Sequence, residues 1–338
     1  MAIESLSQMV IPGFSGGGGA APGGTEGAVQ YKSGSALAGA ANAVIDNGDL
    51  TLLWNDSPVT PPTGQVKLFG RKLASRMLPA SVGPSGLAAV LQPGIWRQKI
   101  ASWNPPGNST SVPGIFGMNA PTALGTATAR NVATTSLFSR TRRLGYVSGA
   151  TAAAFAGHYS TQAQFTTGNG AGGGGFFYSC RFGISDAAAV AGARAFVGMS
   201  SSVAAPTNVE PNTLTNSIGL AQLSTDSTQL YLVYGGSAAQ AAIPLGVNFP
   251  PMAGTGAANG IMYELTLFSP PALNGVVHYR VERQGTTVFV EGTITPATAG
   301  TQLPASITFL AHRAWRCNNA TAAAVGIDII NVYIETDY

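Results

Sequence analysis

Residues 260–296 read GIMYELTLFSPPALNGVVHYRVERQGTTVFVEGTITP, and this stretch decides the fold class of the chain. It holds three runs rich in β-branched and aromatic residues, with a Pro-Pro pair after the first run and a turn around Gly285 after the second. Residues 216–236 repeat the pattern, and residues 305–315 and 324–338 supply two closing runs. Short runs at intervals of roughly 8 to 12 residues, divided by turn signals, are typical of antiparallel β-sandwiches. The sequence therefore predicts an all-β protein with an antiparallel β-sandwich body.

The run FFYSCRFGI, Phe176–Ile184, is the strongest single strand signal. Apolar residues occupy both parities of this run, which favours a position in the middle of a sandwich or at a subunit interface. The next residues, 185–194, read SDAAAVAGAR and predict one short helix with Ser185 or Asp186 as its N-cap. No helical pattern of ordinary length competes with the strands.

The composition is poor in charge. Of the 338 residues, 45% are hydrophobic and 9% are charged, against roughly 25% charged in ordinary soluble domains. Because a surface with few charges discourages aggregation poorly in an isolated monomer, we expect identical neighbours to cover much of it. The 44 glycines and 21 prolines stay below the roughly 25 to 30% of a chain at which low-complexity disorder is the default, so the body is expected to be ordered.

The first residues, 1–26, differ from the rest of the chain. A short amphipathic piece runs into PGFSGGGGAAPGGTEG, and consecutive glycines lose much backbone entropy on ordering without offering side chains that pack. We expect a flexible Gly-rich N-terminal arm that becomes ordered only on a partner surface. The apolar side chains that would anchor it there are Ile3, Leu6, Met9 and Phe14.

Residues 27–64 are predicted to form a short β junction followed by a linker. Asn47-Gly48 lies between the apolar flanks AVID and LTLLW, which is a strong signal for a β-hairpin. Residues 57–64 read SPVTPPTG, and such a Pro-rich stretch cannot lie inside a sheet. The β-sandwich body is therefore expected to span residues 65–338.

The charge pattern gives little support for nucleic-acid binding. The formal net charge is +3, and the densest basic cluster is Arg140, Arg142 and Arg143, with Arg130 ten residues earlier. A nucleic-acid surface needs many phosphate contacts from one basic face. We interpret these arginines as solvated loop residues or as partners in ion pairs between subunits, and we expect no nucleic-acid partner.

Cys180 and Cys317 have neither metal-ligand nor redox-motif spacing, and their apolar surroundings predict buried free thiols. No run approaches 18 apolar residues, and the N-terminus has no basic segment followed by a long apolar core. We therefore expect a chain that is made in the cytoplasm, is not processed and does not span a membrane.

Trp96 and Trp103 flank the basic triplet Arg97-Gln98-Lys99. Aromatic side chains beside cationic ones can stack on a sugar or a base, which makes both tryptophans candidate ligand contacts. The favoured alternative is that they pack in the core or at a subunit interface.

The chain offers few groups for catalysis. His158, His278 and His312 lack the spacing that places two imidazoles on one metal ion, and no serine lies in the context of a nucleophile elbow. Glu282 and Glu291 face each other across the predicted hairpin of residues 277–294, as a pair of glycosidase carboxylates could. Arg280 and Arg283 lie on the same hairpin, so cross-strand ion pairing is the favoured interpretation. We predict no catalytic residue, no metal site and no cofactor.

Several segments resemble a known family. Residues 27–52, GAVQYKSGSALAGAANAVIDNGDLTL, resemble a short segment near the start of tailed-bacteriophage fibre and tailspike chains. Residues 70–93, GRKLASRMLPASVGPSGLAAVLQP, together with NPPGN at 104–108 and the C-terminal run 324–338, are similar to phage and prophage tail proteins.

This resemblance implies a symmetric virion appendage, with a homotrimer favoured. The N-terminal arm would bind other virion proteins, and a jelly-roll or lectin-like body would project towards a glycan or protein of the host surface. A tail fibre or receptor-binding component is the first interpretation, and a capsid decoration or head-fibre protein is the alternative. A glycan-cleaving tailspike is disfavoured, because such chains are long β-helices and no repeat of 20 to 30 residues is visible.

Overall fold

The computed structural model describes residues 28–33, 36–46, 49–84, 88–91, 99–107, 109–114, 116–133, 135–254 and 259–336. The predicted arm 1–26, with Ile3, Leu6, Met9 and Phe14, lies outside the described residues, and so does Trp96. The chain divides into two compact units, Met1–Lys72 with Met77–Gln92, and Leu73–Arg76 with Pro93–Tyr338. The described residues form antiparallel sheets, which confirms the predicted all-β class.

The first unit contains two sheets of three strands each. One sheet has the order β1-β2-β3 and the other the order β4-β5-β6. Their strands are β1 (Ala28–Ser33), β2 (Ala36–Asp46), β3 (Asp49–Leu52), β4 (Lys67–Leu73), β5 (Arg76–Val82) and β6 (Ala88–Val90). Asp46 of β2 pairs with Asp49 of β3, which confirms the hairpin predicted around Asn47-Gly48.

The boundary of the body differs from the predicted one. Residues 65–92 were expected to belong to the sandwich, but β4, β5 and β6 hydrogen-bond among themselves. A small cluster of their own, Phe69, Ala80 and Val82, is buried between them. A tight turn with positive φ at Ala74 and Ser75 joins β4 to β5. The two strands therefore pair with each other, and their backbone N–H and C=O groups form hydrogen bonds within this small sheet. The strands of the sandwich begin only with Lys99.

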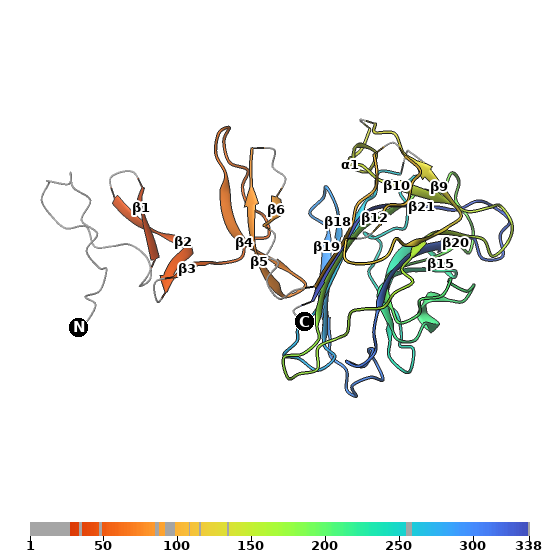
Figure 1. Ribbon diagram of the computed structural model, residues 1–338. Helices are drawn as coiled ribbons and strands as arrows, with labels where there is room; N and C mark the ends of the chain where they lie inside the picture. Colours follow the sequence, from red (N-terminus) through yellow and green to blue (C-terminus); the bar gives the residue numbers. More distant parts are fainter. Residues whose placement is uncertain are drawn as a thin grey trace, which may run out of the picture. The chain divides into compact units, whose positions relative to one another are not determined.

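The second unit is a β-sandwich of two sheets (Figure 1). The first sheet has the order β19-β18-β17-β12-β21-β10-β9, with β7 also paired to β21. Its strands are β7 (Lys99–Trp103), β9 (Thr126–Ala129), β10 (Leu144–Val147), β12 (Phe176–Ile184), β17 (Tyr263–Ser269), β18 (Val277–Arg283), β19 (Phe289–Ile294) and β21 (Gly326–Thr336).

The second sheet of the sandwich has the order β16-β15-β14-β13-β20-β11-β8. Its strands are β8 (Thr122–Leu124), β11 (Phe155–Tyr159), β13 (Arg194–Ser200), β14 (Ser217–Leu223), β15 (Asp226–Gly235), β16 (Ile243–Pro244) and β20 (Ala311–Cys317). Strands β14 and β15 and strands β17 to β19 follow the runs that the sequence predicted.

The main core lies between the two sheets. Strand β12 lies between β17 and β21, as predicted for a run that is apolar on both parities. Its residues Tyr178, Cys180 and Phe182 are buried in this core, where they join side chains of the opposite sheet such as Met199. Cys180 and Cys317 are both buried free thiols, which confirms that prediction.

The predicted helix at residues 185–194 is absent. Asp186 is fully buried there, and its carboxylate accepts hydrogen bonds from Nε of Arg316 at 2.7 Å and from the backbone N–H of Gly326 at 2.7 Å. Because a buried carboxylate is stable only when it is paired, this contact overrides the local helical propensity. The described residues contain no helix of the length and apolar character that crossing a bilayer requires.

One short helix that the sequence did not predict does form. It is α1 (Leu137–Arg140), and the hydroxyl of Ser136 caps it by accepting a hydrogen bond from the backbone N–H of Ser139 at 3.1 Å. The hydroxyl of Ser139 accepts in return from the backbone N–H of Ser136 at 2.9 Å. This reciprocal capping fixes α1 against the sandwich and sets the position of Phe138.

Candidate functional site

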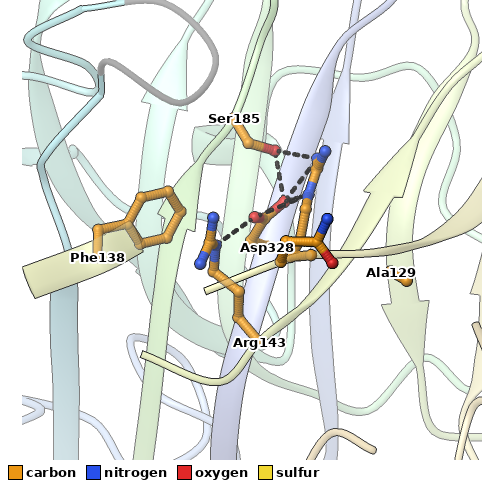
Figure 2. A pocket seen from close by; sticks show the side chains of 7 residues that line it. Ala129, Phe138, Arg143, Ser185 and Asp328 are labelled. Carbon is orange, nitrogen blue, oxygen red and sulfur yellow. Dashed lines mark hydrogen bonds and ion pairs between the residues drawn. The ribbon is translucent and has the colours of Figure 1, made fainter. Parts of the chain in front are cut away.

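A cavity of about 230 Å³ opens beside strand β21 of the sandwich. Residues from β9, α1 and β21 line it, together with residues from the segments that follow β9, α1 and β12 (Figure 2). The lining residues are Ala129, Arg130, Asn131, Phe138, Arg143, Ser185 and Asp328.

Asp328 lies at the centre of this pocket. Its neighbours Ile327 and Ile329 point into the core of the sandwich, so the alternation of β21 places Asp328 on the outer face of the sheet. The pocket residues that lie above this face nevertheless bury it, and only 1% of its side chain is exposed. A carboxylate buried to this degree needs cationic partners.

Two arginines and one serine supply the partners of Asp328. Arg130 donates from Nε at 3.0 Å and from Nη2 at 2.9 Å, and Arg143 donates from Nε at 2.9 Å. Ser185 donates its hydroxyl proton to Oδ1 at 2.6 Å. Figure 2 shows the carboxylate enclosed by these groups. Because both oxygens already accept charge-assisted hydrogen bonds, Asp328 orients the two guanidinium groups.

The guanidinium of Arg143 is fixed from a second side. Its Nη1 donates to the backbone carbonyls of Ser139 at 3.0 Å and Thr141 at 3.2 Å, and its Cζ atom lies 4.7 Å from the ring centre of Phe138. Helix α1 and the residue after it therefore hold Arg143 in place, together with the cation–π contact of Phe138.

Two glycines make room for this arrangement. Gly145 of β10 and Gly183 of β12 are the residues directly opposite Asp328 in the two neighbouring strands. A Cβ atom at Gly145 would collide with Nε of Arg130, and one at Gly183 would lie 2.5 Å from the ring of Phe138. Both glycines therefore leave room for a guanidinium and an aromatic ring to lie directly on the sheet.

The charges of the pocket do not cancel. Two guanidinium groups face one carboxylate, which leaves a formal charge of +1. Among the described residues, Nη1 of Arg130 and Nη2 of Arg143 have no hydrogen-bond partner. Arg130 keeps 23% of its side chain exposed, so solvent and ligands can reach it. No histidine or cysteine is among the lining residues. The arrangement is suited to binding an anion.

The structure confirms the interpretation of the four clustered arginines for two of them. Arg140 and Arg142 are exposed, as expected of solvated loop residues. Arg130 and Arg143 instead pair within the chain, on Asp328. One signal in the sequence pointed to this: Asp328 interrupts the apolar run VGIDIINVY, and an acid inside a buried strand needs a cation beside it.

The ligand-contact hypothesis is wrong for Trp103. Its side chain is 0% exposed, and its ring makes an edge-on contact with His158 at a centroid distance of 4.9 Å. Strand β7 places it in the main core, which confirms the packing alternative. Trp103 is therefore not available for stacking on a ligand from solvent.

His158 and His312 form a buried polar chain with two tyrosines across the sandwich. The hydroxyl of Tyr146 lies 2.9 Å from Nδ1 of His158, the two Nε2 atoms lie 2.9 Å apart, and Nδ1 of His312 lies 3.0 Å from the hydroxyl of Tyr178. One imidazole must carry its proton on Nε2 and the other on Nδ1, because only one hydrogen fits between the two Nε2 atoms. Both residues are fully buried and their ring nitrogens bond within this chain, so their role is structural.

The remaining candidate groups also make structural contacts. Arg280 of β18 lies opposite Glu291 of β19 and bonds to both carboxylates of the predicted pair, at 2.7 Å to Glu282 and 3.2 Å to Glu291. This confirms the ion-pair interpretation through Arg280. In the part of the chain that the structure describes, no three His, Cys, Asp or Glu side chains come together as ligands of a metal ion.

The chain is distantly similar to several solved structures. No protein-family model and no curated protein matches the sequence. Among solved structures, a protein of unknown function from Shewanella oneidensis MR-1 is 14% identical, with a TM-score of 0.40, over 71% of this chain and 86% of its own. Arcelin-5, a lectin-like defense protein from Phaseolus vulgaris, is 11% identical, with a TM-score of 0.39, over 70% of this chain and 98% of its own. Peanut lectin is 11% identical, with a TM-score of 0.40, over 70% and 97%.

Proposed function

We propose that the chain is a non-enzymatic virion structural protein of a tailed bacteriophage, acting as a tail fibre or receptor-binding component. Its N-terminal arm would attach to other virion proteins, and its β-sandwich would bind a glycan or protein of the host surface. The resemblance of residues 27–52 and 70–93 to phage tail chains supports the class of protein. The division of the chain into a small N-terminal unit and a sandwich with its own core supports the order of the parts.

The observation that carries the proposal is the surface of the first unit. Ten of the nineteen large apolar side chains that are exposed among the described residues belong to this smaller unit. They include Leu50 at 58%, Val59 at 74% and Leu68 at 61% exposure. Exposed apolar side chains that gather on one part of a protein often mark an interaction surface. Neighbouring copies would cover them, which supports a symmetric homo-oligomer. The resemblance to phage tail chains favours a trimer.

The pocket around Asp328 supports a binding role for the sandwich. It is a concave site with convergent polar groups, which is the general form of a ligand site. Its two arginines are placed to bind and orient a ligand.

Gold-labelled antibodies against the sandwich test the place of the protein in the particle. The proposal predicts label at the tail of intact virions. Uniform label over the capsid would instead support the alternative, a capsid decoration or head-fibre protein. Particles without label at any position would contradict both.

A separate assay tests whether the protein is non-enzymatic. Purified protein is incubated with host-surface polysaccharide, and the reducing ends are counted before and after. We expect no increase. New reducing ends would support the second alternative, a glycan-cleaving tailspike.

A further inference from the structure

We infer that the pocket around Asp328 binds the carboxylate of a sugar acid, such as a uronate residue of an acidic host-surface glycan. The inference rests on the proposed binding role of the sandwich and adds the site and the chemical class of the ligand. It is carried by the net charge of the pocket, its unpaired donors and its size. The two glycines that lie under Arg130 and Phe138 add to it.

The charge of the pocket favours a ligand with a single negative charge. Arg130 and Arg143 bring two positive charges and Asp328 removes one. A monocarboxylate makes the occupied pocket neutral, whereas a phosphate dianion leaves a surplus negative charge beside Asp328. Repulsion between an unbalanced charge and a buried carboxylate is costly where water is largely excluded.

The unpaired donors fit a carboxylate. Nη1 of Arg130 and Nη2 of Arg143 have no protein partner among the described residues. Guanidinium groups present planar, directed donors that match the two oxygens of a carboxylate. Asp328 does not compete for these two nitrogens, because its own bonds use Nε of both arginines and Nη2 of Arg130. It holds the guanidinium groups apart, at a fixed orientation, before a ligand arrives.

The size and walls of the pocket fit one sugar ring. Its volume of about 230 Å³ lies below the roughly 300 to 1,000 Å³ of sites for drug-sized ligands. Ala129 and Phe138 are its apolar lining residues, of which Ala129 is the more exposed, and the exposed amide of Asn131 can donate to and accept from hydroxyl groups. A ring with one apolar face, several hydroxyls and one carboxylate matches these groups.

The glycines indicate that the pocket is constructed rather than incidental. Gly145 and Gly183 flank Asp328 on both sides in the sheet, and any side chain at either position would displace Arg130 or Phe138. An ion pair that only stabilised the sheet would need one cation beside Asp328. The structure instead places two cations there, and the guanidinium of Arg130 lies directly over Gly145.

Isothermal titration calorimetry on the purified full-length protein tests the inference. The probes are sodium glucuronate, its neutral counterpart glucose, and inorganic phosphate, all in the same sodium chloride buffer. We expect glucuronate to bind, and glucose and phosphate to bind at least tenfold more weakly. Equal binding of glucose, equal binding of phosphate, or no binding of glucuronate would each overturn the inference.

One variant and a matched control test whether glucuronate binds in this pocket. Arg130→Gln removes a partly exposed donor of the pocket, and Arg142→Gln removes the same charge from an exposed residue next to Arg143. We expect Arg130→Gln to weaken glucuronate binding at least tenfold and Arg142→Gln to leave it within twofold. The same affinity in Arg130→Gln as in the unchanged protein would overturn the assignment to this pocket.

The variant Gly145→Ala tests whether binding depends on the position of the Arg130 guanidinium as well as on its charge. The added methyl group would displace the guanidinium of Arg130 without changing the net charge of the protein. We expect binding to weaken as in Arg130→Gln while the unfolding transition in urea remains cooperative. Unchanged binding would show that the orientation of Arg130 is irrelevant and would contradict the inference. The titration is independent of virion labelling, so a failure of one leaves the outcome of the other intact.

Discussion

At the scale of residues, the two buried histidines are sensitive to acid. Burial lowers the pKa of His158 to about 3 and lowers the pKa of His312 well below its ordinary value. Both are therefore neutral in the folded protein, while in the unfolded chain they bind protons below about pH 6.5. The unfolded state binds more protons in this range, so the free energy of unfolding decreases as the pH falls from 6.5 towards 3.

The expected loss between pH 7 and pH 5 is about 2 kcal/mol for each buried histidine. Urea melts at the two pH values measure it. In this interval few carboxylates titrate, so the loss reports on the histidines. The variant His278→Gln changes a histidine outside the buried chain and should retain the full loss. A free energy of unfolding that is the same at both pH values would contradict the neutral buried pair.

Asp328 is the residue on which the pocket depends most. Asp328→Asn removes the negative charge and leaves the guanidinium groups of Arg130 and Arg143 without a counter-charge, Arg143 being almost fully buried. Breaking a buried ion pair from one side costs about 3 kcal/mol or more. Urea melts at pH 7 measure the loss, with Arg142→Gln as a control that should change stability by less than about 0.5 kcal/mol. A loss as small as that of the control would show that the ion pairs contribute little.

At the scale of elements, alternation predicts the strands well, while contacts between distant residues decide the exceptions. The runs of β12, β14, β15 and β17 to β19 lie where the sequence places them, because each of them buries apolar side chains in the core. The helix expected at 185–194 fails because Asp186 pairs with Arg316, 130 residues away. The sequence does not predict the pocket around Asp328 for the same reason, because Arg130, Ser185 and Asp328 come together only in the folded chain.

Helix α1 is the element that positions Phe138 and Arg143. Its cap is the hydroxyl of Ser136, and losing an N-cap of this kind costs about 0.5 to 2 kcal/mol. We expect Ser136→Ala to lower the free energy of unfolding by that amount and to speed hydrogen exchange at α1. Ser237→Ala, at an exposed serine whose side chain makes no hydrogen bond among the described residues, is the matched control. Equal stability and exchange in both variants would mean that the cap does not hold α1.

At the scale of the whole molecule, we propose a different role for each of the two units. The first unit, with its exposed apolar side chains, would assemble the chains, and the sandwich would bind the host surface. The low charge of the sequence pointed to assembly, because 9% charged residues protect a monomer poorly. It could not locate the contact, since exposure depends on which strands pair with which, and β4 to β6 pair among themselves.

The mass of the protein in solution tests this division of work most directly. Light scattering compares the full chain with the sandwich fragment 93–338, whose folding is checked by circular dichroism. The account predicts a full chain of about three times its 34.3 kDa mass and a monomeric fragment. A full chain that stays at 34.3 kDa over a wide range of concentration would contradict it.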